Sequence, residues 1–355
     1  MNLSLPLQQL RAITRRHFFG QTGLGLGSLA LNALLAKDGH ADNESYRLPS
    51  KVKSVIYLHM AGSPSQLDLF ENKPALAKLH DTECPQEYLE GKRFAFIKGT
   101  PKMLGPQFRY SQHGETGQWV SELLPNLCRQ IDDLCIIRSI STEQFNHSPA
   151  QLLMQTGNPL LGNPAMGSWV TYGLGSENEN LPGFISLNAN KPSVFSSAFL
   201  PTHHSGTPIG INGEDMSKAT INHIHSDHLS PATKRTQIDF IQTMNRDHLL
   251  ERENDPRLDG VIQSMELAFR MQAGAPELLD LSGESRRTLE RYRVGRKLSV
   301  GTCRPTDFGR QCLLARKFAE AGVRFIEINH GGWDQHKNHR RDLKANCDTI
   351  DAPIR

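Results

Sequence analysis

The chain has 355 residues, of which 22% are charged and 37% hydrophobic, a composition typical of globular proteins and not of disordered or collagen-like ones. The formal charge is +3, but residues 1–41 alone hold four basic residues and one acidic residue, which leaves 36 of each in the remainder. Because the remainder is neutral, the sequence does not favour a nucleic-acid partner. The length fits one large domain or two modest ones.

The first 41 residues predict an export signal. Arg15 and Arg16 form a twin-arginine pair followed by two phenylalanines, and the apolar stretch 18–35 is diluted by four glycines. This pattern is typical of a twin-arginine (Tat) signal peptide. The alternative is a membrane anchor, but the stretch barely reaches the ~18 apolar residues that a spanning helix needs. We therefore expect transient contact with the Tat translocase, a mature domain over residues 42–355 without a stable membrane span, and a periplasmic or extracellular location.

The first strand of the mature chain is expected at residues 55–58, where valine, isoleucine, tyrosine and leucine follow one another. The glycine- and proline-containing loop after it ends at Asp68. Asp68 is the first candidate metal ligand, and the alternative is an ordinary carboxylate at a turn or helix start. Further on, apolar residues at helical spacing predict a helix over residues 120–133, and residues 134–139 predict a strand. Helix, strand and loop in succession are typical of a parallel sheet.

A second candidate site lies in the run from Phe145 to Gly157. Ser148 before Pro149 predicts a helix start, with the serine as N-cap, and Gly157 predicts the end of that helix. Free backbone N–H groups and the positive end of the helix dipole could hold an oxyanion there. His147 and Ser148 are therefore the candidate catalytic residues. The alternative is that Ser148 only caps the helix and His147 only bonds to a loop.

Later segments complete the expected α/β pattern. A strand is expected at residues 182–187, a helical insertion at about residues 230–295, and a helix from Phe308 to Glu320 that Asp307 caps and Gly322 ends. The cluster His223, His225, Asp227 and His228 resembles a metal site, but no strand leads into it, so we interpret it as a solvated loop. The six cysteines form no C-x-x-C pair, and Cys128 and Cys312 fall in amphipathic patterns that favour buried thiols.

The run 323–328 predicts a buried strand that leads into residues 329–336, where two glycines precede Trp333, Asp334 and His336. Ligands of parallel α/β sheets bind beyond the carboxyl ends of the strands. A carboxylate and an imidazole two residues apart can both turn toward one cation. Asp334 and His336 are therefore candidate metal ligands.

Several of these motifs, in this order, resemble the bacterial family named domain of unknown function 1501. The resemblance rests on the twin-arginine start and on four segments: residues 54–68, the Asn146–Gln151 run ending at Thr156-Gly157, residues 166–170, and residues 330–336. That family is grouped with sulfatases and alkaline phosphatases. The resemblance implies a three-layer α/β/α sandwich of the alkaline phosphatase type and a divalent cation, which could be zinc, calcium, magnesium or manganese. It also makes Asp68 the early metal carboxylate and Asp334 with His336 a later ligand pair.

Two departures from the related sulfatases bear on the chemistry. Aligned on Pro149, the sulfatase nucleophile position holds His147 and the arginine position holds Gln151, so no cysteine is present to become formylglycine. Three interpretations stay open: Ser148 is the nucleophile, His147 is a ligand, base or phosphoryl acceptor, or the site has lost this chemistry. The resemblance also implies a longer C-terminal part, so we expect a truncated product with an uncovered apolar sheet edge.

The sequence thus favours an exported, sulfatase-like, metal-dependent hydrolase of sulfate or phosphate esters, whose activity truncation could abolish. Its substrate would be a sulfated or phosphorylated small molecule or polysaccharide. The alternative is a non-catalytic exported protein that binds sulfated polysaccharide or a cell-surface partner. A third hypothesis is that the truncated chain folds poorly.

Overall fold

The structure is a computed structural model that describes residues 52–91, 99–189, 191–211, 216, 230–251, 255–297, 300–301 and 306–355. The chain separates into two compact units, Met1–Lys53 and Ser54–Arg355, and the fold described below is that of the second unit. The predicted signal segment 1–41 and the histidine cluster at residues 223–228 lie outside the described residues.

A four-stranded parallel sheet forms the centre of this unit. Its order is β1 (Val55–Met60), β6 (Phe325–His330), β4 (Phe184–Ala189) and β5 (Thr207–Ile211). Every residue of β6 and β4 is buried, as expected for inner strands rich in large apolar side chains. The strands predicted near residues 55–58, 182–187 and 323–328 are therefore confirmed, whereas β5 was not predicted.

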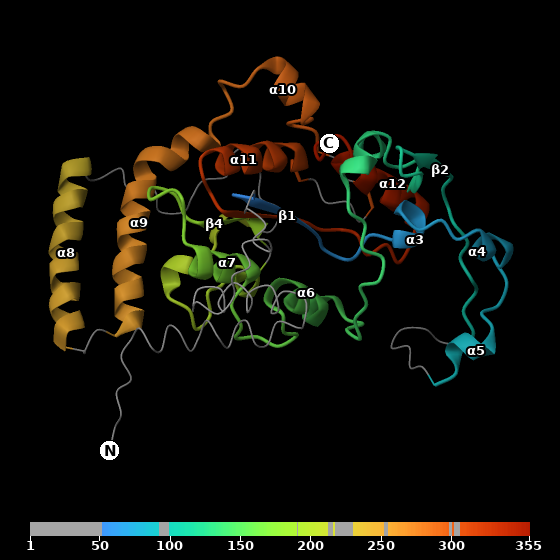
Figure 1. Cartoon of the computed structure of the whole chain (residues 1–355), viewed down its shortest axis with the longest axis horizontal. Helices are drawn as coiled ribbons and strands as arrows, with labels where there is room; N and C mark the ends of the chain where they lie inside the picture. Colours follow the sequence, from blue (N-terminus) through green and yellow to red (C-terminus); the bar gives the residue numbers. More distant parts are fainter. Residues whose placement is uncertain are drawn as a thin grey trace, which may run out of the picture. The chain divides into compact units, whose positions relative to one another are not determined.

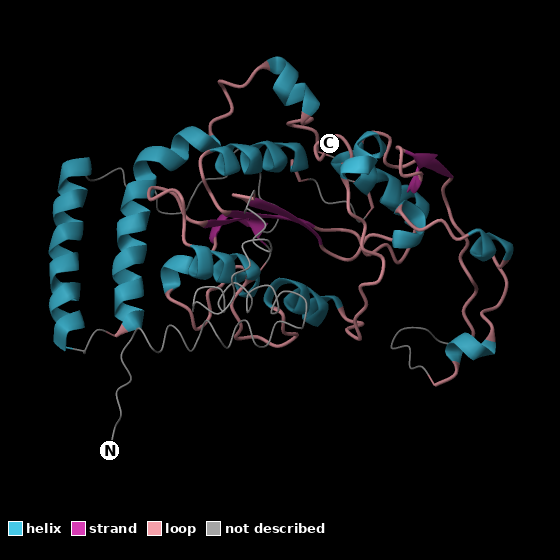
Figure 2. Ribbon diagram, viewed as in Figure 1, coloured by secondary structure: helices cyan, strands magenta, loops and turns pink. Residues whose placement is uncertain are grey.

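Helices lie on both faces of the sheet (Figure 1). Helix α11 (Phe308–Glu320) covers one face, and α6 (His147–Thr156) and α7 (Met166–Leu174) cover the other. Figure 2 shows the magenta strands between these two sets of cyan helices. Since side chains alternate along a strand, Ile326 and Ile328 of β6 pack into the main core with α11, whereas Phe325 packs with Phe184 on the opposite face. The chain is thus a mixed α/β protein with a mostly parallel sheet.

Shorter elements connect these parts. They are the helices α3 (Gln66–Leu69), α4 (Pro74–Lys78), α5 (Gln86–Leu89), α10 (Arg286–Arg291) and α12 (His339–Ile350), the antiparallel hairpin β2 (Tyr110–His113) and β3 (Gln118–Ser121), and the 3-10 helices η2 (Leu127–Asp133), η3 (Pro192–Val194) and η4 (Thr202–His204). The capping prediction for α11 is confirmed, because the Asp307 side chain accepts a hydrogen bond from the backbone N–H of Arg310 at 3.0 Å.

In the segment 120–139 one prediction is right only in part, since residues 127–133 of the predicted helix form a 3-10 helix, and one is wrong. Residues 120–133 form the end of β3 and the 3-10 helix η2, because Pro125 lacks an N–H and restricts the residue before it. Residues 134–139 form no strand in the described part of the chain, and Ile137 is 63% exposed. The strand β1 is an edge strand whose Val55 and Ile56 are 38% and 43% exposed, so apolar surface is open at this edge.

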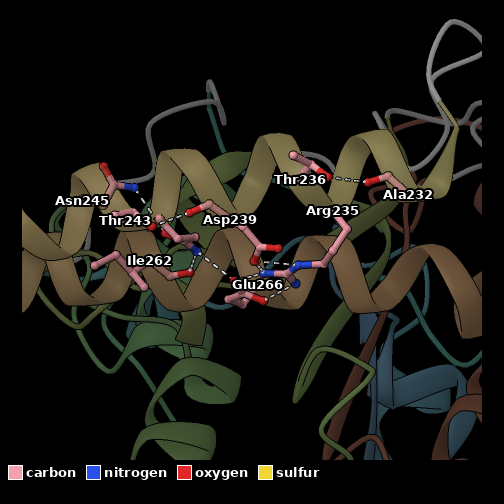
Figure 3. Close-up of polar contacts among 9 residues, drawn as sticks. Ala232, Arg235, Thr236, Asp239, Thr243, Asn245, Ile262 and Glu266 are labelled. Carbon is pink, nitrogen blue, oxygen red and sulfur yellow. Dashed lines mark hydrogen bonds and ion pairs between the residues drawn. The ribbon is translucent and has the colours of Figure 1, made fainter.

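The predicted helical segment is confirmed as a pair of long helices, α8 (Pro231–Glu251) and α9 (Pro256–Leu279). Figure 3 shows how polar side chains join them: the guanidinium of Arg235 on α8 donates to both carboxylate oxygens of Glu266 on α9 at 3.0 Å and also to Asp239 on its own helix. Further along α8, Gln242 is fully buried, and its Nε2 donates to the carbonyl of Ile262 at 2.8 Å.

None of the helices formed by the described residues is long and apolar enough to cross a membrane. The thiols of Cys84, Cys128, Cys135, Cys312 and Cys347 are free. The prediction of a buried thiol is confirmed for Cys312, whereas Cys128 is only half-buried.

Candidate active site

The loops that follow β1 and β6 meet at the carboxyl edge of the sheet. The Ala61 N–H donates to the carbonyl of His330 at 2.8 Å, and the Trp333 N–H donates to the carbonyl of Ala61 at 3.3 Å. Gly62 has a φ of +107°, and a Cβ added there would lie 2.7 Å from the backbone nitrogen of Asp334. The close approach of the two loops therefore requires glycine at this position.

Hydrogen bonds with buried side chains fix the loop 331–336. The indole of Trp333, which is 1% exposed, donates to Nδ1 of His330 at 2.9 Å, and the Asn346 side chain donates to the carbonyl of Gly332 at 2.7 Å. Burial lowers the pKa of His330 to about 4, so the ring is neutral near pH 7 and can accept this bond. The backbone around Asp334 is thereby fixed while its side chain stays accessible.

Three of the predicted site residues come together on this loop. Oδ2 of Asp334 lies 2.9 Å from Nε2 of His147 and 2.8 Å from Nε2 of His336. The side chains of His147, Asp334 and His336 are 52%, 41% and 75% exposed. Two imidazoles from different segments thus meet on one carboxylate oxygen at the solvent-facing edge of the sheet.

Helix α6 positions His147 and Ser148, but it begins earlier than predicted. Its N-cap is Asn146, whose side chain accepts from the Ser148 N–H at 3.3 Å, and Ser148 lies inside the first turn. The predicted N-cap at Ser148 is therefore wrong, because Asn146 has the extended backbone and side-chain oxygen of a cap. The predicted end is confirmed: Gly157 has left-handed backbone angles and its N–H bonds to the carbonyl of Leu153. The hydroxyl of Ser148 is left free to bond elsewhere.

That hydroxyl contacts a lysine that the sequence did not single out. Nζ of Lys191, just after β4, donates to Oγ of Ser148 at 3.0 Å, and both residues are exposed. The ammonium N–H groups of Lys191 and the O–H of Ser148 are donors to which an anion could bind, and charge-assisted hydrogen bonds are about twice as strong as neutral ones.

Asp68 lies in a separate cluster. Its carboxylate accepts from Oγ of Ser65 at 2.8 Å and from the Gln107 N–H at 2.9 Å, and it contacts Nε2 of His339 at 2.8 Å. Burial alone would raise the pKa of Asp68, but the hydrogen bonds from His339, Gln107 and Ser65 outweigh it and lower the pKa below its ordinary value. Asp68 is thus an ionised acceptor that ties the loop after β1 to the start of α12.

A buried acid lies on the α6 side of the sheet. Glu327 of β6 is 1% exposed, Gln155 of α6 donates to one of its oxygens, and Ser186 of β4 donates to the other at 3.3 Å. Burial raises the pKa of Glu327 to about 7 despite these bonds. The sequence presented it only as one polar residue in an apolar strand.

In the described residues, no group of three or more histidine, cysteine, aspartate or glutamate side chains is already arranged to hold a metal ion.

The structure brings His147, Ser148, Asp334 and His336 to one edge of the sheet, whereas Asp68 pairs with His339. His339 could have been noticed as the next histidine after His336, three residues further on. Lys191 and Glu327 carry no local pattern that would have distinguished them.

The sheet, the helices on both faces and this cluster define an α/β protein whose candidate site is formed by loops at the carboxyl ends of parallel strands. The chain belongs to the family described as protein of unknown function DUF1501, whose model matches residues 52–355. No curated protein and no solved structure matches the chain. The family predicted from the motifs is confirmed, while the wider superfamily and the truncation stay predictions.

Proposed function

We propose that this chain is an exported, metal-dependent hydrolase of sulfate or phosphate esters with an alkaline-phosphatase-like α/β/α fold. The observation that carries the proposal is the convergence of His147 and His336 on one oxygen of Asp334. Its position supports the proposal too, since sites of open α/β sheets lie beyond the carboxyl ends of the strands. Export rests on the twin-arginine pattern of residues 15–16.

The donor types in the cluster fit a divalent cation. Two imidazole nitrogens and one carboxylate oxygen are the protein ligands of many catalytic zinc sites, which keep a further position open. Imidazoles favour zinc over calcium or magnesium, which prefer oxygen ligands. His147, Asp334 and His336 would hold the cation, which would polarise an ester oxygen and lower the pKa of bound water to about 7. Asp68 stays a ligand only by family resemblance, because its oxygens already accept from Ser65 and Gln107 and contact His339.

Residues next to the cluster supply the rest of the chemistry. Lys191 places a positive charge 3.0 Å from Oγ of Ser148 and would attract the anionic group of an ester to that hydroxyl. The ammonium donates to Oγ, so the Ser148 hydroxyl hydrogen can point elsewhere and an alkoxide at Oγ would be stabilised. These contacts suit Ser148 as the nucleophile, and His147 lies one residue away as ligand or base.

Metal content and turnover test the proposal. We expect the purified chain to retain zinc or another divalent cation and to hydrolyse aryl phosphate or aryl sulfate, and we expect Asp334→Asn to lose at least tenfold in both metal affinity and turnover. The matched control is Asp348→Asn, since Asp348 is similarly exposed, at 43% against 41%, and its carboxylate pairs with Lys344 on its own helix, away from the candidate site. Purified wild type that retains no divalent cation, or an Asp334→Asn variant as active as the control, would contradict the hydrolase proposal.

The second candidate is a non-catalytic exported protein that binds sulfated polysaccharide or a cell-surface partner. The exposure of His147, Asp334 and His336 favours it, because an open surface can accept an extended ligand. This candidate predicts binding of a sulfated oligosaccharide without turnover in wild type. Turnover that requires added metal and Asp334 would contradict it.

A further inference from the structure

A cavity of about 390 Å³ adjoins the start of α6. It lies between the first turns of α6, the segment 159–161 and the segment 191–194 that begins at Lys191. Ser148 lines it, and the preceding residue, His147, belongs to the cluster around Asp334. The cavity is therefore directly next to the candidate active site.

Part of the cavity lining is polar and positively charged. Lys191 and Ser148 both line it and are joined by their 3.0 Å hydrogen bond. Among the described residues that line the cavity, Lys191 is charged and no carboxylate is present. This part of the lining complements an anion.

The remaining wall is largely apolar. It consists of Pro149, Leu152, Pro159, Leu161 and Val194, with Gln151 and Ser193 as the polar residues among them. Leu152 and Val194 are buried, whereas Leu161 is 73% exposed, so a ligand would remove its side chain from water. An apolar cavity of ~150 Å³ already accommodates a benzene ring, so this one has room for an aryl group or a branched alkyl group.

We propose that this cavity binds the hydrophobic alcohol part of a phosphate or sulfate ester, with the anionic group on Lys191 and Ser148. The substrate class is then an aryl or alkyl ester and not a sugar ester, because most of the wall is proline, leucine and valine, and Gln151 and Ser193 could pair only some of the hydroxyls of a sugar. The assignment rests on the proposed ester hydrolysis for the reacting bond. Binding itself uses side chains outside the His147–Asp334–His336 cluster.

Calorimetric titration of the full chain in excess EDTA tests the proposal, because binding is then measured without turnover. The probes are phenyl phosphate and phenyl sulfate, each compared with glucose 6-phosphate and glucose 6-sulfate. We expect at least one phenyl ester to bind about tenfold more tightly than the sugar ester with the same anion. The tighter phenyl ester identifies the anion.

Two pairs of comparisons assign that binding to the cavity. Lys191→Met should weaken the phenyl ester about tenfold, while Lys191→Arg should retain it within threefold. Leu161→Asn should weaken the phenyl ester several-fold and leave the sugar ester unchanged. Both side chains are exposed, so the variants should fold, and unchanged thermal unfolding would verify this.

Three results would each overturn the proposal. They are equal affinities for phenyl and sugar esters, no measurable binding of any probe, and phenyl binding that neither Lys191→Met nor Leu161→Asn weakens. Failure of the proposed hydrolase function gives a different result. In that case phenyl esters still bind in EDTA with this dependence on Lys191 and Leu161, but no added metal produces turnover.

Discussion

At the scale of single residues, Gly62 decides how closely the loop after β1 approaches the loop that carries Asp334. Its φ of +107° is unfavourable for any side chain, and an added Cβ would lie 2.7 Å from the Asp334 backbone nitrogen. We expect Gly62→Ala to lower the free energy of unfolding by about 3 kcal/mol, since the steric conflict adds to the ~1–3 kcal/mol of backbone strain. Denaturant unfolding of the purified variant measures this loss.

Gly157 provides the matched control. Its φ of +75° is also positive, but nothing lies within 4 Å of an added Cβ. Gly157→Ala should therefore cost only about 1 kcal/mol, the conformational part alone. Equal losses for the two variants would show that backbone conformation, and not the contact with the Asp334 loop, makes glycine necessary at position 62.

The candidate site could be predicted from the sequence only where a local pattern existed. Asp334 and His336 follow a recognisable strand and His147 begins a recognisable helix, and parallel strands deliver their following loops to one edge. The bond between His147 and Asp334 joins residues 187 positions apart, so no local pattern could show it. The same holds for Lys191 with Ser148, and for Asp68, whose partner His339 is 271 positions away.

At the scale of elements, helix α11 and the segment 120–139 show what periodicity can and cannot predict. The helix Phe308–Glu320 has an aspartate cap, an unbroken apolar stripe and a glycine after its end, so every local signal agrees. In residues 120–133 the apolar spacing is helical, but Pro125 interrupts it. Residues 134–139 have strand composition, yet a strand also needs a neighbour, which composition cannot supply.

The pairing of α8 with α9 depends on a buried amide. Gln242 is fully buried and bonds across the helix pair to the carbonyl of Ile262 at 2.8 Å. We expect Gln242→Ala to destabilise the helix pair by about 1–3 kcal/mol, because the hydrogen bond is lost and a small cavity is left. Hydrogen exchange of the α8 amides should report faster local opening.

Thr243 is the control for that prediction. It is exposed, and its hydroxyl bonds to the carbonyl of Asp239 on the same helix, so Thr243→Ala should change stability by less than about 0.5 kcal/mol. Faster α8 exchange in Thr243→Ala than in Gln242→Ala would contradict a role for the buried amide in joining the two helices.

At the scale of the whole molecule, the two faces of the sheet differ in chemistry. The α11 face of β6 contributes Ile326 and Ile328 to the main apolar core, whereas the opposite face carries Glu327 beneath Gln155 of α6. Burial, with a further contribution from Glu327, raises the pKa of Tyr57 on the neighbouring strand to about 12, so this tyrosine stays protonated near neutral pH. Glu327 and its neighbours Ser186, Tyr57 and Gln155 lie on three strands and one helix, so the protonation state of one buried acid affects contacts among these four elements.

Glu327 should make the stability of the folded chain fall as the pH rises from about 4.5 to about 7. Burial raises its pKa from an ordinary 4.5 to about 7, so in this window the folded state retains a proton that the unfolded state has released. Rising pH then favours unfolding by up to about 1.4 kcal/mol per pH unit, and the effect ends once both states are ionised.

Glu327→Gln keeps the side chain neutral and able to accept from Gln155. We therefore expect the free energy of unfolding of this variant to lack the decline that Glu327 causes in the wild type. Denaturant unfolding of both proteins at half-unit steps from pH 4.5 to 8 measures the difference, which isolates Glu327 because every other titrating group is shared. Parallel curves would mean that Glu327 is ionised in the folded chain throughout this range.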